Sequence, residues 1–359
     1  MTNHPRYGII EARKRDGRKN MEKQISFTDM EYSMRKRMTK REKFLDCMDE
    51  IIPWEEVVEI IKPYYYDNKV GRKPRGIETM FRMYLLQTWY SLSDEALEDS
   101  IYDSYAMRKF MRLDFTVESV PDATTLCKFR KILVDNRIDK LFFSSIAKYM
   151  EDNGYMMRGG TILDATIIDA PKSTKNENNE RDPEMHQAQK GNTWYFGAKF
   201  HVGVDAGSGL VHSLETTAAN VADSIPAHKL LRKDDEVAYG DSAYCALAKH
   251  DEIKNDPDLS KIAFRTNSQK PYRKIKWEKG PGTYWFEYME YQKSRTRCKV
   301  EYVFHIIKDI FGFRKTPYRG LRKLEAKGNM LFALANLYMI AKTNANSTMT
   351  MAEALSNIG

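Results

Sequence analysis

The sequence has few cysteines and lacks any apolar run long enough to cross a membrane. Its four cysteines are scattered over 359 residues without a C-x-x-C pair, which excludes a disulfide framework and a zinc ribbon. No signal-peptide-like segment opens the chain, and Asn336 interrupts the longest apolar stretch, 330–341. There is no internal repeat. These absences predict a soluble, cytoplasmic protein with no membrane partner and with reduced thiols.

Positive charge is concentrated at the front of the chain. The formal net charge is +8, and residues 1–43 hold 13 Lys or Arg against 6 Asp or Glu, so the remainder is almost balanced. Basic clusters at 13–15 and 35–37 are suited to neutralising phosphates. Residues 1–43 therefore predict a basic arm that binds nucleic acid. A disordered solubilising tail is the alternative.

Residues 44–150 have the apolar spacing of helices. A stripe at i, i+3, i+4, i+7, i+8 and i+11 runs from Ile77 to Thr88, and further helices are expected over 94–111 and 122–134, the second with Asp122 as N-cap. A series of short helices fits a DNA-binding domain and also fits an ordinary helical bundle. Lys128, Arg130 and Lys131 could contact phosphates or be solvated.

The pattern changes to strands after residue 159. Strands are expected over 161–169, 194–205 and 210–217, the last two as a hairpin, and then over 236–240 and 261–265. One helix is expected over 225–233 and a long one over 294–311, after an aromatic and basic insertion at 266–293. The expected domains are a helical one at 44–150 and an α/β one at 155–342, followed by a flexible tail at 343–359.

Three carboxylates stand in unusual surroundings. Asp164 lies in the middle of an apolar strand, where an unpaired charge would cost several kcal/mol. Asp241 follows an apolar strand at the end where open sheets present ligand-binding groups, although by itself it could be an N-cap. Glu301 shares a helix face with Arg297, His305 and Lys308, although an isolated pair of this kind would be a surface salt bridge. Three hard oxygen ligands on separate elements suit Mg²⁺ or Mn²⁺ and not zinc.

Other polar and aromatic residues near these positions have more ordinary explanations. Asp169 is five residues after Asp164 and so points to the opposite face of a regular strand. Asp205 leads into a turn, where aspartate bonds locally. His201, His212 and His305 lack metal spacing and fit structural roles, with a DNA contact open for His305. Trp277 and Trp285 could stack on an unpaired base or simply pack.

The stretches around the three carboxylates resemble the catalytic motifs of insertion-sequence DDE transposases, nearest to insertion-sequence family five. They read LDAT at 163–166, YGDSAY at 239–244 and RCKVE at 297–301, and the segments 181–186 and 196–223 are similar to family hallmarks. Arg297, Glu301 and Lys308 match three positions of the Y-R-E-K signature of the related superfamily. Ser294 stands at the tyrosine position, and the nearest tyrosine is Tyr291.

The resemblance implies a ribonuclease-H-like mixed sheet flanked by helices, preceded by an all-helical domain that binds DNA. It implies that Asp164, Asp241 and Glu301 hold two Mg²⁺ or Mn²⁺ ions, and that Arg297, Lys308 and Ser294 contact DNA phosphates. The expected partners are the terminal inverted repeats of the element, target DNA and a second copy of the chain in a homodimer, in a nucleoid-associated cytoplasmic protein.

Two other functions remain open on the sequence. A stand-alone nuclease on the same fold would hydrolyse DNA without strand transfer. A transposase-derived DNA-binding protein would keep the arm and the helical domain without chemistry, although the presence of all three carboxylates argues against it.

Overall fold

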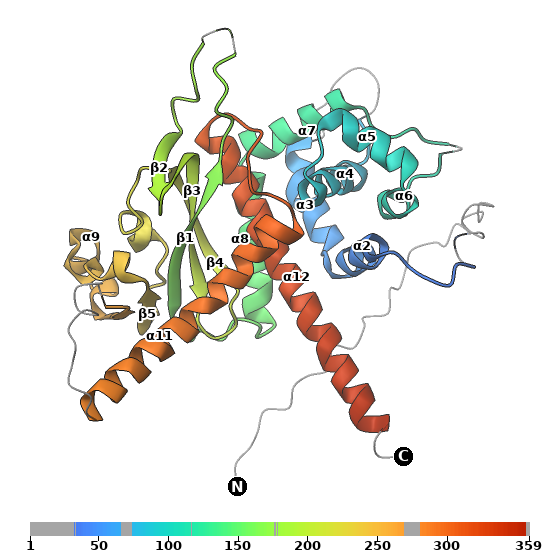
Figure 1. Cartoon of the computed structure of the whole chain (residues 1–359). Helices are drawn as coiled ribbons and strands as arrows, with labels where there is room; N and C mark the ends of the chain where they lie inside the picture. Colours follow the sequence, from blue (N-terminus) through green and yellow to red (C-terminus); the bar gives the residue numbers. More distant parts are fainter. Residues whose placement is uncertain are drawn as a thin grey trace.

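The chain folds into a helical N-terminal region and a mixed sheet flanked by helices, which meet along one long helix (Figure 1). The computed structural model describes residues 32, 34–65, 74–115, 117–175, 177, 179–268 and 281–356. Most of the basic arm, including its cluster at 13–15, and Trp277 lie outside the described residues. Within the described ranges, no helix is long and apolar enough to span a membrane.

Seven helices build the described N-terminal region: α2 (Lys40–Ile51), α3 (Trp54–Tyr65), α4 (Ile77–Tyr90), α5 (Asp94–Asp103), α6 (Tyr105–Met111), α7 (Ala123–Asp135) and α8 (Ile138–Asp152). Asp122 caps α7 as expected, because its side chain accepts a hydrogen bond from the backbone N–H of Thr125. The prediction of a single helix over 94–111 was wrong. Ser104 has an extended backbone, ends α5 and caps α6 by accepting from Met107 N–H.

The sheet consists of β1 (Thr161–Asp169), β2 (His186–Lys190), β3 (Thr193–Asp205), β4 (Val211–Ala218), β5 (Val237–Gly240) and β6 (Ala263–Thr266). β3 pairs antiparallel with β1, β4 pairs antiparallel with β3, and β5 and β6 extend the sheet in parallel on the other side of β1. The spatial order β4-β3-β1-β5-β6 is the ribonuclease-H-like arrangement, with β2 added beside the first part of β3. The expected fold class is therefore confirmed.

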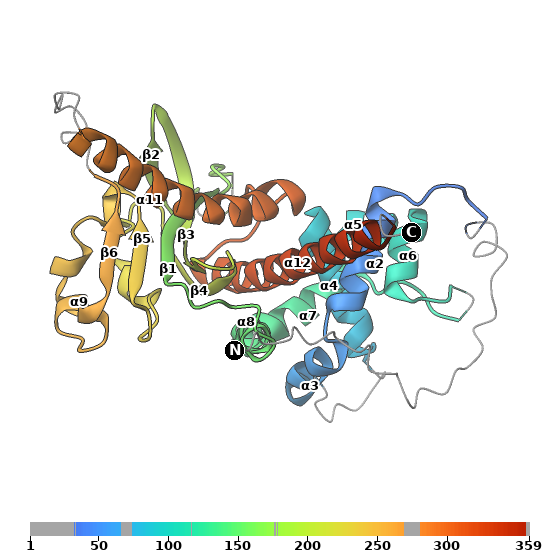
Figure 2. The same ribbon diagram turned by 90° about the horizontal axis from the view of Figure 1, so that it is seen from below.

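Two helices cover one face of the sheet. α11 (Pro281–His305) continues into a π-helical turn, η5 (Ile306–Ile310), and crosses the sheet, while α12 (Leu321–Ser356) lies between the sheet and the N-terminal helices (Figures 1 and 2). Gly328 allows α12 to approach β3, because a Cβ there would come within 2.7 Å of the Phe200 ring. The opposite face is covered by the segments around Leu230, Leu247 and Ile253.

Several expected elements differ from the structure. The helix expected over 225–233 is only a 3₁₀ turn, η1 (Pro226–Lys229), because Asp235 accepts from Arg232 N–H and closes a turn instead. β2 was not expected, because its sequence HQAQK is polar and it becomes a strand only through pairing with β3. The long helix expected from Ser294 begins earlier, at Pro281. The turns before Ser294 were not expected to be helical, because they are exposed and carry no amphipathic pattern.

The last helix was also not expected. α12 is buried on all sides between Met330 and Leu337, so it lacks the one-sided apolar pattern that identifies a surface helix. The residues after 343, which were expected to form a flexible tail, continue α12 as far as Ser356.

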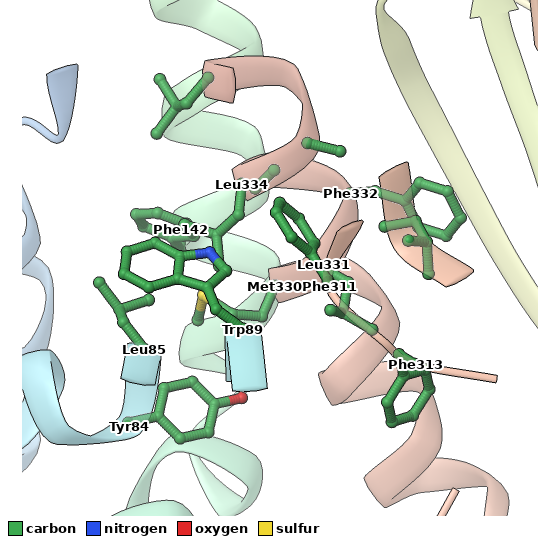
Figure 3. Close-up of a cluster of buried hydrophobic side chains, with 14 of the residues drawn as sticks. Tyr84, Leu85, Trp89, Phe142, Phe311, Phe313, Met330, Leu331, Phe332 and Leu334 are labelled. Atoms are coloured by element: carbon green, nitrogen blue, oxygen red, sulfur yellow. The ribbon is translucent and has the colours of Figure 1, made fainter. Parts of the chain in front are cut away.

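The helical region and the sheet share one hydrophobic core around α12. Figure 3 shows Trp89 of α4, Phe142 of α8 and Leu334 of α12 gathered beside Phe311, which follows η5. All four side chains are at most 2% exposed. Because burial of this apolar surface is the main stabilising contribution, the two regions stabilise each other.

A buried polar network fixes the same junction. Asp139 of α8 accepts hydrogen bonds from the Arg322 guanidinium at 3.0 Å and from the Asn329 amide at 2.8 Å, both on α12. The Asp139 side chain is 2% exposed. A buried carboxylate tolerates such a position only when its oxygens are paired in this way.

Replacing Asp139 should loosen this junction. We expect Asp139→Asn to lower the free energy of unfolding by about 2–4 kcal/mol, because the new amide group opposes the donors of Arg322 and Asn329. Urea unfolding followed by tryptophan fluorescence measures the change. The matched control is Asp152→Asn on the exposed end of α8, which should change stability by less than about 0.5 kcal/mol. Equal losses in the two variants would contradict the role of the network.

Candidate active site

Asp164 lies in β1, and Asp241 directly follows β5, the parallel neighbour of β1. β1 and β5 pair with Thr161 opposite Ala238 and Ile162 opposite Tyr239. Continued by two residues, this register places Asp164 level with Asp241. Since paired residues point to the same face of a sheet, both carboxylates belong to the face that α11 covers. Local strand sequence thus positions two of the three expected carboxylates.

Asp164 carries a charge that its surroundings disfavour. Its side chain is 22% exposed, and Oδ1 accepts a hydrogen bond from Ala165 N–H at 2.7 Å. Burial raises the pKa of Asp164 to about 6, and the negative charges of Asp241 and Asp223 add to this increase. Arg297 acts in the opposite direction. A cation near these carboxylates would favour ionised Asp164.

Asp241 also has a structural role. Its side chain caps the short 3₁₀ turn η2 (Ser242–Tyr244) by accepting from Ala243 N–H at 2.8 Å. This is the N-cap role that the sequence left open. The hydrogen bond uses Oδ1, so the cap holds the carboxylate in a fixed orientation while Oδ2 accepts no hydrogen bond from the described part of the chain.

α11 brings Arg297 to Asp164. The Arg297 Nη1 lies 3.9 Å from the Asp164 Oδ2, and Arg297 Nε is buried without a hydrogen-bond partner among the described residues. Lys299 anchors the helix, because its ammonium group donates to the carbonyl oxygens of Ala206 and Gly207 at the β3–β4 turn. Val300 and Val303 are buried on the side of α11 that faces the sheet.

Glu301 lies one helical turn after Arg297 and is exposed. Over the ranges that the structure describes, no three His, Cys, Asp or Glu side chains come close enough to hold one metal ion. The fold therefore brings Asp164 and Asp241 together near Arg297. Glu301 lies on the neighbouring helix and does not form a three-residue metal-binding group with the two aspartates. The donor set still fits a hard divalent cation, because carboxylate oxygens crowd at this point without a full complement of opposite charge.

The sequence did not identify Asp223 as part of this site. Asp223 accepts a hydrogen bond from Lys199 Nζ at 2.8 Å and lies 3.8 Å from the buried His201 ring. Burial is the main cause that lowers the pKa of His201 to about 4, so this ring is neutral at pH 7. The available signal was that Lys199, His201 and Asp223 all fall within the hallmark segment 196–223.

Tyr244 was also missed. It is 1% exposed, and its hydroxyl group is buried without a hydrogen-bond partner among the described residues. Burial raises its pKa, and the charges of Asp223, Asp164 and Asp241 raise it further. An unpaired phenol beside three carboxylates indicates a group that is positioned for the site and not for packing alone.

The remaining expected residues are placed as follows. Ser294 accepts a hydrogen bond from the Asn267 amide at 3.3 Å, and Tyr291 is exposed. Asp205 bonds locally to Ser208 as expected, and His212 bonds to Thr161 and Ser213. His305 contacts Asp309 one turn further along the chain. Trp285 is 68% exposed and makes an edge contact with Tyr288.

The raised pKa of Asp164 gives a pH-dependent stability. The Asp164 carboxyl group has a pKa of 3.8 in the unfolded chain and of about 6 in the folded protein, so the folded protein binds the proton more tightly. Protonated Asp164 therefore contributes stability that is complete below pH 3.8 and is lost as the pH rises to about 6. We therefore expect Asp164→Asn to be more stable than the wild type at pH 7 without metal, by about 1–3 kcal/mol. This gain should disappear near pH 4.

Thermal unfolding at pH 4 and pH 7 in the presence of a chelator measures this difference. Asp258→Asn is the matched control, since the Asp258 side chain is 42% exposed and the strand that follows it, β6, is separated from β1 by β5. It should show no comparable gain. An Asp164→Asn protein that is less stable than the wild type at pH 7 would contradict the crowding of charge at this position.

Comparisons with known proteins agree with the fold and the motifs. Residues 33–132 match the family described as Transposase domain (DUF772), and residues 156–337 match the family described as Transposase DDE domain. The chain is also similar to a solved structure titled "Cryo-EM structure of piggyBac transposase synaptic complex with hairpin DNA (SNHP)", with 12% identity, 84% of this chain and 73% of that chain covered, and a TM-score of 0.43. That similarity is too weak to carry over residues or activity. The DDE match spans just over half of the chain and includes all three expected carboxylates, so this protein belongs to the Transposase DDE domain family.

Proposed function

We propose that this protein is the transposase of an insertion sequence of the family-five type, which binds the terminal inverted repeats of its element, cleaves DNA there and joins the freed ends to target DNA. The observation that supports this most is the position of Asp164 on β1 and of Asp241 directly after the adjacent parallel strand β5, with Arg297 of α11 beside Asp164. Membership of the DDE family implies metal-dependent transposase activity.

In this proposal, Asp164, Asp241 and Glu301 hold two Mg²⁺ or Mn²⁺ ions. Bound divalent ions would activate a water or a 3′-hydroxyl group and stabilise the leaving oxygen of the phosphodiester. Asp164 is anchored on the central strand and Asp241 on a capped turn, so both are held in place before substrate binds. Glu301 supplies the third carboxylate from α11.

Arg297 would change partners when DNA binds. In the structure its Nη1 lies beside Asp164, and its buried Nε has no partner among the described residues. Asp164 would hold a metal ion, and the Arg297 guanidinium group would donate two hydrogen bonds to a DNA phosphate. Ser294 and Lys308 are the further phosphate contacts that the signature assigns.

The helical region would recognise the ends of the element. Residues 44–150 together with the basic arm form the DNA-binding part in this proposal, and their shared core with the sheet holds the bound end in a fixed relation to Asp164. Synapsis of two ends requires two active sites, so we propose that the working form is a homodimer.

Removing any one carboxylate should abolish chemistry without preventing DNA binding. We expect Asp164→Asn, Asp241→Asn and Glu301→Gln each to reduce Mg²⁺-dependent cleavage of terminal-repeat DNA by at least about 10³-fold, because each removes a charged metal ligand. Cleavage of end-labelled duplex and binding of the same duplex are measured in parallel. Near-normal cleavage by any of these variants would remove that residue from the metal site.

Matched controls separate this effect from a general loss of charge. Glu252 on α9 (Asp251–Lys254) is exposed, and the Asp258 side chain is 42% exposed. Glu252→Gln and Asp258→Asn should both cleave like the wild type. Incubating pre-cleaved ends with plasmid distinguishes the two enzymatic functions. Joined product supports a transposase, and hydrolysis without joining supports a nuclease.

Arg297→Ala should impair chemistry through phosphate positioning. We expect cleavage to fall by about 10- to 100-fold, because the lost interaction is a charge-assisted hydrogen bond of about 1.5–3 kcal/mol. Arg297→Lys should restore part of the rate but not all, since an ammonium group cannot form a two-point contact. Full activity in Arg297→Ala would place the residue outside the site. Arg295→Ala, an exposed neighbour on α11, is the control.

A further inference from the structure

A group of cations gathers at the far end of α11, away from the carboxylates. Lys308 lies in the π-helical turn η5 and is half-buried, yet it forms no hydrogen bond or ion pair within the part of the chain that the structure describes. The positive charges of Lys190 and Arg314 act on it more strongly than the negative charges of Asp169 and Asp309. Together with burial, which has the largest effect, they lower the pKa of Lys308.

Three separate segments meet beside the end of β1, because β3 pairs with both β1 and β2 and residues 314–316 bond to Asp169 of β1. Lys190 is the last residue of β2, directly before the turn into β3, and is exposed. Arg314 lies on the strip that follows η5, and this strip is fixed to the end of β1, because Asp169 N–H donates to the Arg314 carbonyl and Thr316 N–H donates to the Asp169 carbonyl. The cluster is therefore defined by the fold and not by chance proximity in sequence.

The neighbouring acids do not balance this charge. Asp309 is shared, since one of its oxygens contacts the His305 ring and the other accepts from the Arg314 guanidinium. Asp169 Oδ1 is buried without a hydrogen-bond partner, and Asp169 forms no ion pair with Lys308 or Lys190 among the described residues. Lys190 and Lys308 remain without acidic partners, and an external anion would complement them.

The position of the cluster indicates which anion would fit. Lys308 is seven residues after Glu301, which corresponds to roughly 10 Å along a helix and to the rise of about three base pairs of duplex DNA. A ligand that reaches both the carboxylates and this cluster must therefore be a repeated phosphate chain. The strand that is cut at the carboxylates has this chemistry.

We propose that Lys190 and Arg314 join Lys308 to form a second phosphate-binding site, which holds the DNA backbone a few nucleotides from the phosphodiester that is cleaved. This inference rests on the proposed function, because it places the same DNA strand at both ends of α11. It adds two residues, from the β2–β3 hairpin and from the strip after η5, that the signature on the helix does not include.

The salt dependence of DNA binding tests this site. Each phosphate contact that is lost should reduce the slope of log K against log salt concentration by about 0.9. We expect Lys190→Gln and Arg314→Gln each to reduce the slope by about this amount, with weaker binding at physiological salt. The measurement uses the full-length protein, a labelled terminal-repeat duplex and no divalent metal, so that no cleavage occurs.

Lys190→Gln is the decisive variant, because Lys190 is exposed and makes no contact on which folding depends, whereas Arg314→Gln also frees Asp309. Lys254→Gln on the exposed side of α9 removes the same charge elsewhere and should keep the wild-type slope. An unchanged slope in Lys190→Gln, or an equal reduction in Lys254→Gln, overturns the second site while leaving the proposed function intact. Failure of the wild-type protein to bind the duplex overturns both.

Discussion

The parallel pairing of β1 with β5 is the constraint on which the rest of the site depends. It places two carboxylates side by side, in a partly buried position where their mutual repulsion is not relieved by solvent. Burial and this repulsion together disfavour the charge on Asp164. Arg297 approaches Asp164 from α11 and favours that charge, and Asp241 is oriented by its own cap.

Much of this arrangement could be predicted from the sequence, for local reasons. Asp164 and Asp241 were identifiable because each interrupts or ends an apolar strand, and strand patterns depend on neighbouring residues. Asp223 and Tyr244 were not singled out, although both lie in segments that resemble the family, because their proximity to Asp164 arises only when the sheet brings distant segments together. The same reason explains α12, whose all-round burial removes the one-sided pattern by which helices are detected.

The helix α11 organises the charges of the site into two groups. Its middle carries Arg297 and Glu301 beside the sheet carboxylates, and its end carries Lys308 among cations from two other segments. The sequence placed these three residues on one face of a regular helix. The π-helical turn from Ile306 to Ile310 changes that spacing, because it contains more residues per turn than an α-helix. Lys308 lies in this turn, where the charges of Lys190, Arg314 and Asp169 act on it.

The shared core around α12 also limits how such a protein can change. Trp89 and Phe142 of the helical region are covered by Leu334 and Phe311, which the chain supplies some two hundred residues later. Neither part could be exchanged for a homologous part without rebuilding this surface, and a chain cut between α8 and β1 would expose apolar side chains on both fragments. The helical region and the sheet must therefore be inherited together as one unit.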